Sequence, residues 1–355
     1  MTTKKAKRII VTGGAGFIGS AFIRRIIATT DWQVLNIDKL TYAGNMETLA
    51  SIADSPNYQF IRGDICDRRL VDKILTDFRP DGLIHFAAES HVDRSINEPA
   101  PFISTNILGT YTLLESVRMY LETAGPNIKN SFRFHQISTD EVFGSLGDSG
   151  VFSENSPYRP NSPYSASKAA SDHLVRAWEK TYQLPVVSTN SSNNYGPFQH
   201  PEKLIPLLVF NALHERPLPI YGNGENVRDW LFIEDHVDAL LAVFERGKIG
   251  ETYNVGGDCE KTNIEVVAKI CDLLDVKRPR ISGRKYRELI EFVADRPGHD
   301  FRYAMNCTKI KGELGWRPQE NFERGIEKTL DWYISNMEWC KKMRSLSSPL
   351  ETNLE

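Results

Sequence analysis

The first part of the chain alternates between short runs of apolar residues and longer segments whose apolar positions recur every three or four residues. Short apolar runs are typical of buried strands, and the longer spacing is typical of helices that bury one face. The pattern predicts strands at 8–12, 33–38, 58–62, 82–86, 185–188 and one that ends at 139, and helices at 20–30, 68–78, 106–121 and from 164 onward. Strands that alternate with helices form parallel sheets. We therefore expect an α/β fold with a Rossmann-like, doubly wound parallel sheet.

The alternation becomes irregular after residue 192. Segments 229–233 and 251–255 have the pattern of strands that return to the first lobe, and 264–274 and 322–336 that of helices. A chain of 355 residues exceeds the length at which one core usually suffices. We predict a first lobe of residues 1–192, completed by returning segments near 229–257. Residues 193–228 and 258–355 are expected to form a smaller, interleaved C-terminal lobe that binds substrate.

Three glycines separate the first predicted strand from the first predicted helix. Gly13, Gly16 and Gly19 form a G-x-x-G-x-x-G pattern. This context favours a tight turn, close approach of the backbone to a pyrophosphate, and a helix N-terminus directed at it. Asp38 ends the second strand, where a carboxylate binds an adenosine ribose and repels a 2′-phosphate. The pattern predicts NAD rather than NADP, although Lys39 beside Asp38 weakens the argument.

Candidate chemistry is concentrated between residues 138 and 168. Thr139, Asp140 and Glu141 follow a buried strand, where ligands of parallel sheets lie. Tyr164 and Lys168 are four residues apart at the start of a helix and share a face. A neighbouring ammonium favours the phenolate, so we expect Lys168 to lower the pKa of Tyr164 and make it a general base.

Each of these signals also has a purely structural interpretation. A tyrosine and a lysine at this spacing are more often surface packing, and an Asp-Glu pair is usually a solvated turn or a helix start. The order of these residues behind a nucleotide-binding unit favours function. The Gly-, Ser-, Asn- and Pro-rich segment 144–163 joins the two halves of this candidate site, and loops of that length are often functional.

Composition excludes several classes of protein. The formal net charge is −3, which gives no electrostatic argument for binding nucleic acid or an anionic membrane. No signal peptide or transmembrane segment is recognisable. The five cysteines are scattered and lack zinc-ligand spacing, which favours free thiols in a reducing compartment. We expect a cytoplasmic protein without a metal site.

Together, Gly13-x-x-Gly16-x-x-Gly19, Thr139 and Tyr164-x-x-x-Lys168 resemble the extended short-chain dehydrogenase/reductase superfamily. Segments 139–144, 163–169, 192–197, 201–206 and 228–230 are similar to those of the dTDP-glucose 4,6-dehydratase family within it, and the likeness runs from about Arg8 to Trp332. Phe143 departs from the family, where many members carry tyrosine, and we expect little consequence. The segment 145–156 is short compared with that of some family members, and 345–355 matches nothing in the family.

The resemblance implies an NAD-dependent lyase that removes water across C5 and C6 of a glucose ring after transient oxidation at C4. Tyr164 would take the 4-hydroxyl proton while hydride passes to NAD. Lys168 would hold the nicotinamide ribose, and Thr139 would bond the 4-oxygen. Glu141 would abstract the C5 proton and Asp140 would protonate the departing 6-hydroxyl. The hydride would then return to C6. These two roles need carboxyl groups whose pKa values are pushed apart.

The resemblance also implies two sets of binding residues. The cofactor set is Gly13, Gly16, Phe17, Ile18, Gly19, Asp38, Lys39, Leu40, Thr41, Asp64, Ile65, Ala87, Ala88, Ser90, Thr105, Tyr164, Lys168 and Asn194. The substrate set is His91, Thr139, Asn193, Lys203, Leu204, Pro219, Ile220, Tyr221, Arg228, Asn263, Arg296 and His299. Tyr221 would stack on the base, and the two arginines would neutralise the phosphates.

Family members usually form homodimers through the helices near 106–121 and 165–182. Leu113, Val117, Val175 and Trp178 lie on these helices, although they suit an internal core equally well. Alternative functions are a UDP-sugar 4-epimerase, a dehydratase of another nucleotide sugar, and an NAD-binding sensor without catalysis. Asp140-Glu141 favours elimination, since neither an epimerase nor a sensor needs the pair. The sequence does not distinguish thymine from uracil, nor rhamnose from other deoxysugars as the end product.

Overall fold

The computed structural model describes residues 6–347 and places a parallel seven-stranded sheet at the centre of the first lobe. Its strand order is β10-β6-β5-β4-β1-β2-β3, and every neighbouring pair is parallel. The strands are β1 (Arg8–Thr12), β2 (Gln33–Asp38), β3 (Tyr58–Arg62), β4 (Gly82–His85), β5 (Arg133–Thr139), β6 (Val186–Ser191) and β10 (Thr252–Val255). The order reverses between β1 and β4, and ligands of doubly wound sheets bind above such a point. The predicted fold class is confirmed.

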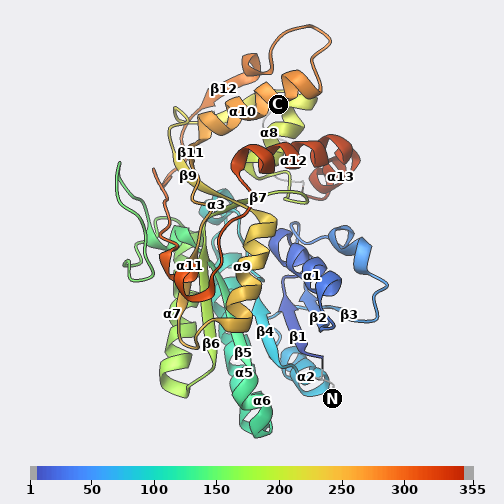
Figure 1. The fold of residues 1–355 in the computed structure, drawn as a ribbon, viewed down its shortest axis with the longest axis vertical. Helices are drawn as coiled ribbons and strands as arrows, with labels where there is room; N and C mark the ends of the chain where they lie inside the picture. Colours follow the sequence, from blue (N-terminus) through green and yellow to red (C-terminus); the bar gives the residue numbers. More distant parts are fainter. Residues whose placement is uncertain (1–5, 348–355) are drawn as a thin grey trace.

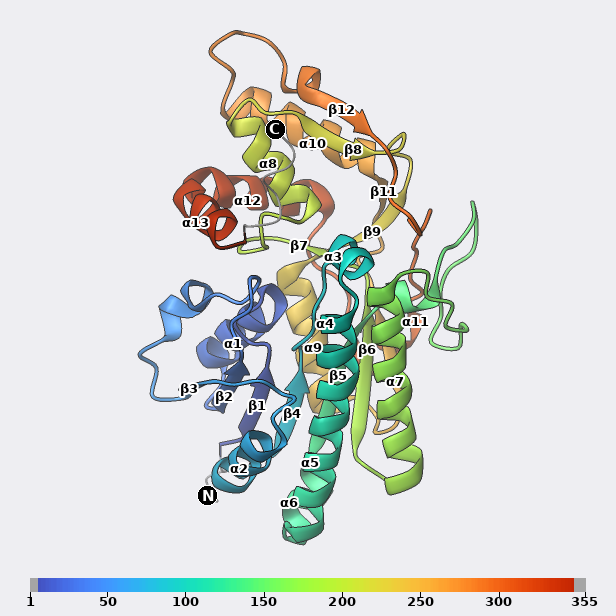
Figure 2. The same cartoon turned by 180° about the vertical axis from the view of Figure 1, so that it is seen from behind.

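Helices cover both faces of this sheet. Helices α1 (Phe17–Thr29) and α9 (Ile233–Arg246) lie on one face, shown in Figure 1. Helices α2 (Arg68–Phe78), α5 (Thr110–Thr123) and α7 (Pro163–Tyr182) lie on the other, shown in Figure 2. Apolar side chains of α2, α5 and α7 pack with those of the sheet into one buried cluster. Full burial of one such side chain stabilises a fold by about 1.5–3 kcal/mol.

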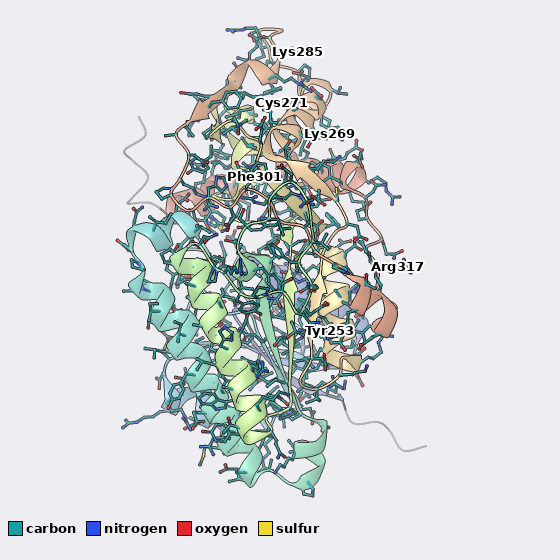
Figure 3. All side chains as sticks on the ribbon, turned by 90° about the vertical axis from the view of Figure 1, so that its left-hand side faces the viewer. Tyr253, Lys269, Cys271, Lys285, Phe301 and Arg317 are labelled. Carbon is teal, nitrogen blue, oxygen red and sulfur yellow. The ribbon has the colours of Figure 1, made fainter. Side chains whose placement is uncertain are left out.

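Two small sheets lie apart from the large one, in the region of the predicted second lobe. The first has the order β11-β9-β7, from β11 (Glu260–Thr262), β9 (Val227–Phe232) and β7 (Asn193–Tyr195), and the second pairs β8 (Leu218–Tyr221) with β12 (Ile290–Val293). The main helices of this region are α8 (Leu204–Leu213), α10 (Asn263–Lys277), α12 (Phe322–Ser335) and α13 (Met337–Ser347). The buried cluster under α1 continues into α8, α10 and α12, so the lobes share a core. In the view of Figure 3, Phe301 is seen below Cys271 and above Tyr253.

Shorter elements complete the chain. They are η1 (Met46–Ile52), α3 (Val92–Asn97), α4 (Ala100–Phe102), η2 (Ile103–Gly109), α6 (Pro126–Ser131), η3 (Asp140–Phe143), η4 (Tyr286–Leu289) and α11 (Thr308–Leu314). Within 6–347, no helix has the length and apolar character needed to cross a bilayer.

Three sequence-based predictions differ from the structure. The helix predicted at 106–121 is a π-helical turn, η2, followed by α5. The helix predicted to start at residue 20 begins at Phe17, directly after Gly16. The strand predicted at 229–233 is present as β9 but pairs with β7 and β11, so only β10 returns to the large sheet. Sheet membership depends on distant partners, which a local pattern does not specify. The division into lobes stays a prediction, and part of it lies outside the described residues.

Candidate active site

A cavity lies above the carboxyl ends of the central strands. Its walls come from the β1–α1 turn, the ends of β2, β4, β5 and β6, and the start of α7. Of the predicted cofactor residues, these line it: Gly13, Gly16, Phe17, Ile18, Gly19, Asp38, Lys39, Thr41, Asp64, Ile65, Ala87, Ala88, Ser90, Thr105, Tyr164, Lys168 and Asn194. Leu40 does not line the cavity. Its backbone N–H instead donates to Asp38 Oδ1 at 2.8 Å.

The glycine-rich turn leaves no space for side chains. Gly13 has φ of +72°, and a Cβ there would lie 2.5 Å from the backbone nitrogen of Ala87. A Cβ on Gly19 would lie 2.4 Å from the carbonyl oxygen of Gly13. The turn therefore keeps β1, β4 and α1 close together and presents bare backbone to the cavity. Such a cradle at a helix N-terminus fits a pyrophosphate.

Hydrogen bonds and an ion pair hold the side chains of Asp38 and Lys39 in place at the end of β2. Asp38 Oδ2 accepts a hydrogen bond from the backbone N–H of Ala15 at 3.0 Å, which ties it to the glycine-rich turn. Lys39 Nζ donates to Thr105 Oγ1 at 3.1 Å and lies 3.6 Å from Asp64 Oδ2. Lys39 is thus directed toward Thr105 and Asp64, while the Asp38 carboxylate is placed to repel a 2′-phosphate. The arrangement fits NAD.

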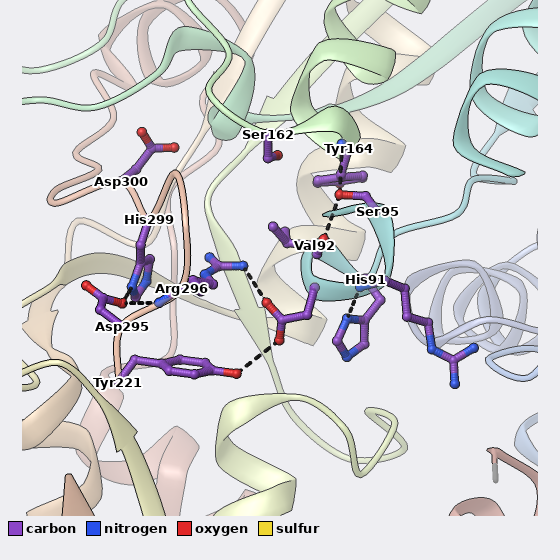
Figure 4. A network of polar contacts seen from close by, with 12 residues as sticks. His91, Val92, Ser95, Ser162, Tyr164, Tyr221, Asp295, Arg296, His299 and Asp300 are labelled. Atoms are coloured by element: carbon purple, nitrogen blue, oxygen red, sulfur yellow. Dashed lines mark hydrogen bonds and ion pairs between the residues drawn. The ribbon is translucent and has the colours of Figure 1, made fainter. Parts of the chain in front are cut away.

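The catalytic candidates meet at one end of the cavity. Strand β5 ends at Thr139, whose hydroxyl donates to Asp140 Oδ1 at 3.2 Å and accepts the backbone N–H of Glu141 at 3.3 Å. Helix α7 begins with a capping box on Ser162, which fixes Tyr164 in the first turn. The backbone N–H of Tyr164 donates to Ser95 Oγ at 3.1 Å (Figure 4). Thr139, Asp140, Glu141, Tyr164 and Lys168 all line the same cavity.

Burial controls the pKa of Tyr164. Burial raises it, as does the charge of Glu141, while a hydrogen bond from Thr139 lowers it. Lys168 Nζ donates to the carbonyl oxygen of Ile137 at 2.7 Å, and its own pKa is lowered by burial. The pKa of Tyr164 is therefore raised overall rather than lowered, and the contribution of Lys168 to it stays a prediction. The sequence predicted which face of the helix carries the Lys168 ammonium. It did not predict that the ammonium donates to the carbonyl oxygen of Ile137.

The adjacent carboxyl groups have different surroundings. Burial raises the pKa of Asp140 well above its usual range, and Glu141 and Asp229 raise it further. Burial also raises the pKa of Glu141, but Arg296, Arg228 and Lys203 oppose that rise. Arg228 is the only cation that opposes the rise at Asp140, whereas three cations oppose it at Glu141, and this difference favours placing a shared proton on Asp140. This is the direction of separation that the sequence argument required.

Some predicted substrate residues lie in the cavity, and others form a polar network nearby. Thr139, Asn193 and Lys203 line the cavity. Beyond it, Asp93 joins two of the others: Tyr221 donates to Asp93 Oδ2 at 3.2 Å, and Arg296 Nη1 lies 3.3 Å from Asp93 Oδ1 (Figure 4). Sequence reasoning missed Asp93, because a single aspartate on a short helix carries no signal.

Two histidines of the substrate set lie at the sides of this network. His299 Nδ1 lies 2.6 Å from Asp295 Oδ1 (Figure 4). His91 caps α3 by accepting the backbone N–H of Arg94 at 3.3 Å, and its Nε2 lies 3.6 Å from Glu202 Oε2. Burial lowers the pKa of His91 to about 4, so its ring is neutral near pH 7.

Arg228 is held by the protein's own backbone. Its guanidinium donates to the carbonyl oxygens of Val227 at 2.7 Å, Phe301 at 3.2 Å and Asp300 at 2.9 Å. The guanidinium carbon also lies 4.4 Å from the ring centre of Tyr303. Arg228 thus contributes a fixed positive charge beside the carboxyl pair. The rest of the predicted substrate set, Leu204, Pro219, Ile220 and Asn263, does not line the cavity.

Several cavity residues were not predicted. They include Asn45, Thr48, Phe198, Gln199, His200, Glu202, Trp339 and Met343. Trp339 and Met343 lie on α13, at the far end of the sequence from the glycine-rich turn. No local pattern connects them to it.

Comparison with known proteins agrees with this geometry. The sequence model of the family GDP-mannose 4,6 dehydratase matches residues 10–329. dTDP-glucose 4,6-dehydratase 1 of Escherichia coli (strain K12) is 56% identical over 359 residues, covering 98% of this chain and 99% of the relative.

Two solved structures share the fold. The dTDP-glucose 4,6-dehydratase of Bacillus anthracis in complex with NAD has a TM-score of 0.85 and 46% identity, covering 95% of this chain and 100% of that one. The dTDP-glucose 4,6-dehydratase of Streptomyces venezuelae with NAD and TYD bound has a TM-score of 0.87 and 44% identity, covering 95% of this chain and 99% of that one.

Proposed function

The chain belongs to the nucleotide-sugar dehydratase family described by the GDP-mannose 4,6 dehydratase model, and from this we infer that it converts dTDP-glucose to dTDP-4-keto-6-deoxyglucose. It is an NAD-dependent hydro-lyase. The observation that carries this inference is the pair Asp140 and Glu141, which lies with Tyr164 in the cavity that also contains the glycine-rich turn. An epimerase has no use for that pair.

The residues present fit NAD. The bare turn at Gly13 and Gly19 would hold the pyrophosphate, Asp38 the adenosine ribose, and Lys168 the nicotinamide ribose. When bound, NAD accepts a hydride from C4 of the sugar and later returns it to C6. The remaining steps belong to side chains of this chain.

Tyr164 is the proposed base for oxidation at C4. In its deprotonated, phenolate form it receives the proton of the 4-hydroxyl and becomes the phenol, and the Thr139 hydroxyl holds the same oxygen. Lys168 has its ammonium on Ile137 O at 2.7 Å and is buried, so its position is fixed. Because the protein's own groups raise the pKa of Tyr164, this step is favoured at alkaline pH.

Glu141 and Asp140 are the proposed base and acid for elimination. A ketone at C4 acidifies the C5 proton, which Glu141 then removes. Asp140 keeps its proton because it is buried beside Glu141 and Asp229. It delivers that proton to the 6-hydroxyl, which leaves as water. Each proton transfer contributes about 10²–10⁴-fold in rate.

The nucleotide diphosphate is proposed to bind at the network around Asp93. Arg296 and Tyr221 both contact Asp93, so a substrate phosphate would compete with that carboxylate for Arg296. An arginine fork binds phosphate in a bidentate manner. Arg228 supports the site through its fixed charge, since its donors are engaged with backbone carbonyls.

We also propose a homodimer. The predicted residues Leu113, Val117 and Val175 are buried inside the protein and belong to its own core. Other apolar side chains on the same segments are exposed, namely Ile103, Leu108, Tyr111 and Met119 on η2 and α5, and Tyr182 on α7. Exposed apolar side chains gathered on neighbouring helices favour burial against a second copy.

The function is tested by incubating the purified protein with dTDP-glucose in D2O and analysing the sugar nucleotide by mass spectrometry and NMR. The expected product has lost one water and carries one deuterium at C5. An unchanged mass with conversion to the galactose epimer would contradict the proposal. UDP-glucose under the same conditions measures preference for the base, because one methyl group is worth only about 1–3 kcal/mol.

A further inference from the structure

Helix α13 forms one wall of the cofactor cavity. Trp339 and Met343 are four residues apart on this helix, so they share a face. Both line the cavity that also contains Gly13, Gly16 and Phe17. Figures 1 and 2 both place α13 next to the α1 end of the first lobe. An element of the second lobe therefore closes a site built on the first.

The loop before η1 connects α13 to the glycine-rich turn. Asn45 Nδ2 donates to Met343 Sδ at 2.7 Å, and the backbone N–H of Asn45 donates to Ala15 O at 3.0 Å. Lys342 forms an ion pair with Glu47 in the first turn of η1. The chain of contacts runs from α13 through this loop to the backbone that cradles the pyrophosphate.

Aromatic contacts fix the ring of Trp339. Its ring centre lies 5.9 Å from that of Phe198, another cavity residue, and 5.2 Å from that of Trp332 on α12. Trp332 also packs on Phe198, with ring centres 4.5 Å apart. The indole is thus held between the core of the second lobe and the cavity.

The indole nitrogen of Trp339 is buried and has no hydrogen-bond partner among the described residues. Buried donors are rarely left unpaired, and an indole N–H can only donate. An acceptor supplied from the cavity would satisfy it. The diphosphate oxygens and ribose hydroxyls of a dinucleotide are such acceptors.

We propose that α13 is a cofactor clasp. Trp339 donates its indole N–H to an oxygen of the diphosphate–ribose portion of NAD, and NAD leaves only when α13 separates from the loop at Asn45 and Glu47. The proposal rests on the assignment of NAD as cofactor. Because each catalytic cycle restores NAD to its oxidised form, a clasp that slows release does not limit turnover.

The test uses the NAD-loaded protein and its Trp339→Phe variant. The variant keeps an aromatic ring and removes only the N–H. We expect NAD to dissociate at least about tenfold faster, measured by exchange against isotope-labelled NAD, because a hydrogen bond to a charged acceptor is lost. Because the N–H has no protein partner, its removal breaks no hydrogen bond in the NAD-free protein. The free energy of unfolding of that form should therefore not fall for this reason.

Trp316→Phe is the matched control. The Trp316 indole is also buried, but it donates to Asp235 O at 3.1 Å and does not line the cavity. We expect the control to destabilise the NAD-free protein while NAD dissociates at the wild-type rate. If Trp339 acts in packing alone, Trp339→Phe will behave like Trp316→Phe: the NAD-free protein will be less stable and NAD will dissociate at the wild-type rate. That result would overturn the proposal.

A second variant weakens the contact between α13 and η1 without altering a residue that lines the cavity. Lys342→Glu places two like charges together at the ion pair with Glu47, and we expect faster NAD release. Wild-type release rates in both Trp339→Phe and Lys342→Glu would refute the clasp. That failure is distinct from failure of the proposed function, in which the wild-type protein would neither retain NAD nor dehydrate dTDP-glucose.

Discussion

Asp140 and Glu141 show how two neighbouring residues of similar chemistry receive different roles. Asp140 is buried, and its Oδ2 has no protein partner among the described residues. Arg228 acts on both carboxyl groups, and Arg296 and Lys203 lower the pKa of Glu141 as well. The environment, rather than residue type, therefore supports the proposed roles of Asp140 as the acid and Glu141 as the base.

Isosteric replacement should separate the two roles. Asp140→Asn and Glu141→Gln are each expected to lower the dehydration rate by about 10²–10⁴-fold. In D2O, sugar recovered from Asp140→Asn should carry deuterium at C5, because Glu141 still exchanges that proton. Sugar recovered from Glu141→Gln should carry none. The exposed Asp148→Asn serves as the control with full activity. The opposite deuterium pattern would reverse the two assignments.

At the level of elements, the β1–α1 turn depends on the absence of side chains. Gly13 adopts a left-handed φ and lies against the backbone of Ala87 on the segment after β4. The turn thus fixes the spacing between two neighbouring strands as well as the binding surface.

Gly13→Ala is expected to lower the free energy of unfolding by about 2 kcal/mol or more, because it adds both left-handed strain and a backbone clash. Binding of NAD should be lost as well. Urea unfolding and NAD titration measure the two effects. Gly147→Ala is the control, since no atom lies within 4 Å of its added Cβ. An unchanged NAD affinity in Gly13→Ala would contradict the assigned cradle.

The strands and helices around the sheet also bury three histidines. His85 on β4, His135 on β5 and His236 on α9 are almost inaccessible to solvent, and burial lowers the pKa of each to about 3. Below pH 6.5 these histidines bind protons in the unfolded chain but remain neutral in the folded protein. The folded state should therefore lose stability as the pH falls from about 6.5 toward 3.

Each ring is expected to contribute about 1.4 kcal/mol per pH unit to this loss. His236→Leu tests one of them, because both ring nitrogens of His236 lack partners among the described residues. Its urea-unfolding free energy should fall less steeply with acidification than that of the wild type. The exposed His173→Gln is the control. Equal slopes in wild type and His236→Leu would contradict the prediction.

At the level of the whole molecule, the exposed apolar residues are unevenly distributed. Leu108, with 54% of its surface exposed, lies on η2 close to Tyr111 and Met119 of α5, on the side of the sheet that α2, α5 and α7 cover. Trp178 on α7 packs against Tyr111 with ring centres 5.8 Å apart, so the two segments form one continuous surface.

Leu108→Glu is expected to convert the proposed dimer to monomers, because a carboxylate would be desolvated in an apolar interface. Light scattering after gel filtration measures the mass. Val276→Glu is the control, since Val276 is 82% exposed on the second lobe. A monomeric wild-type protein, or a dimeric Leu108→Glu variant, would contradict the proposed interface.

The sequence by itself determined the features that depend on neighbours along the chain. Strands β1, β2 and β3 and helix α2 have the predicted bounds, because apolar periodicity records which face of an element is buried. The glycine-rich turn, Asp38 and the Tyr164–Lys168 pair were also found, since spacing within one turn or helix fixes their relative positions.

Only the tertiary structure decided what depends on distant partners. It placed β9 in a separate sheet, brought Trp339 and Met343 to the cofactor cavity, and joined Arg296 to Asp93. It also raised the pKa of Tyr164, because burial and the charge of Glu141 both disfavour the phenolate, and it bonded the Lys168 ammonium to Ile137 O. Desolvation and long-range contacts arise from packing, and packing is a property of the folded chain rather than of any segment within it.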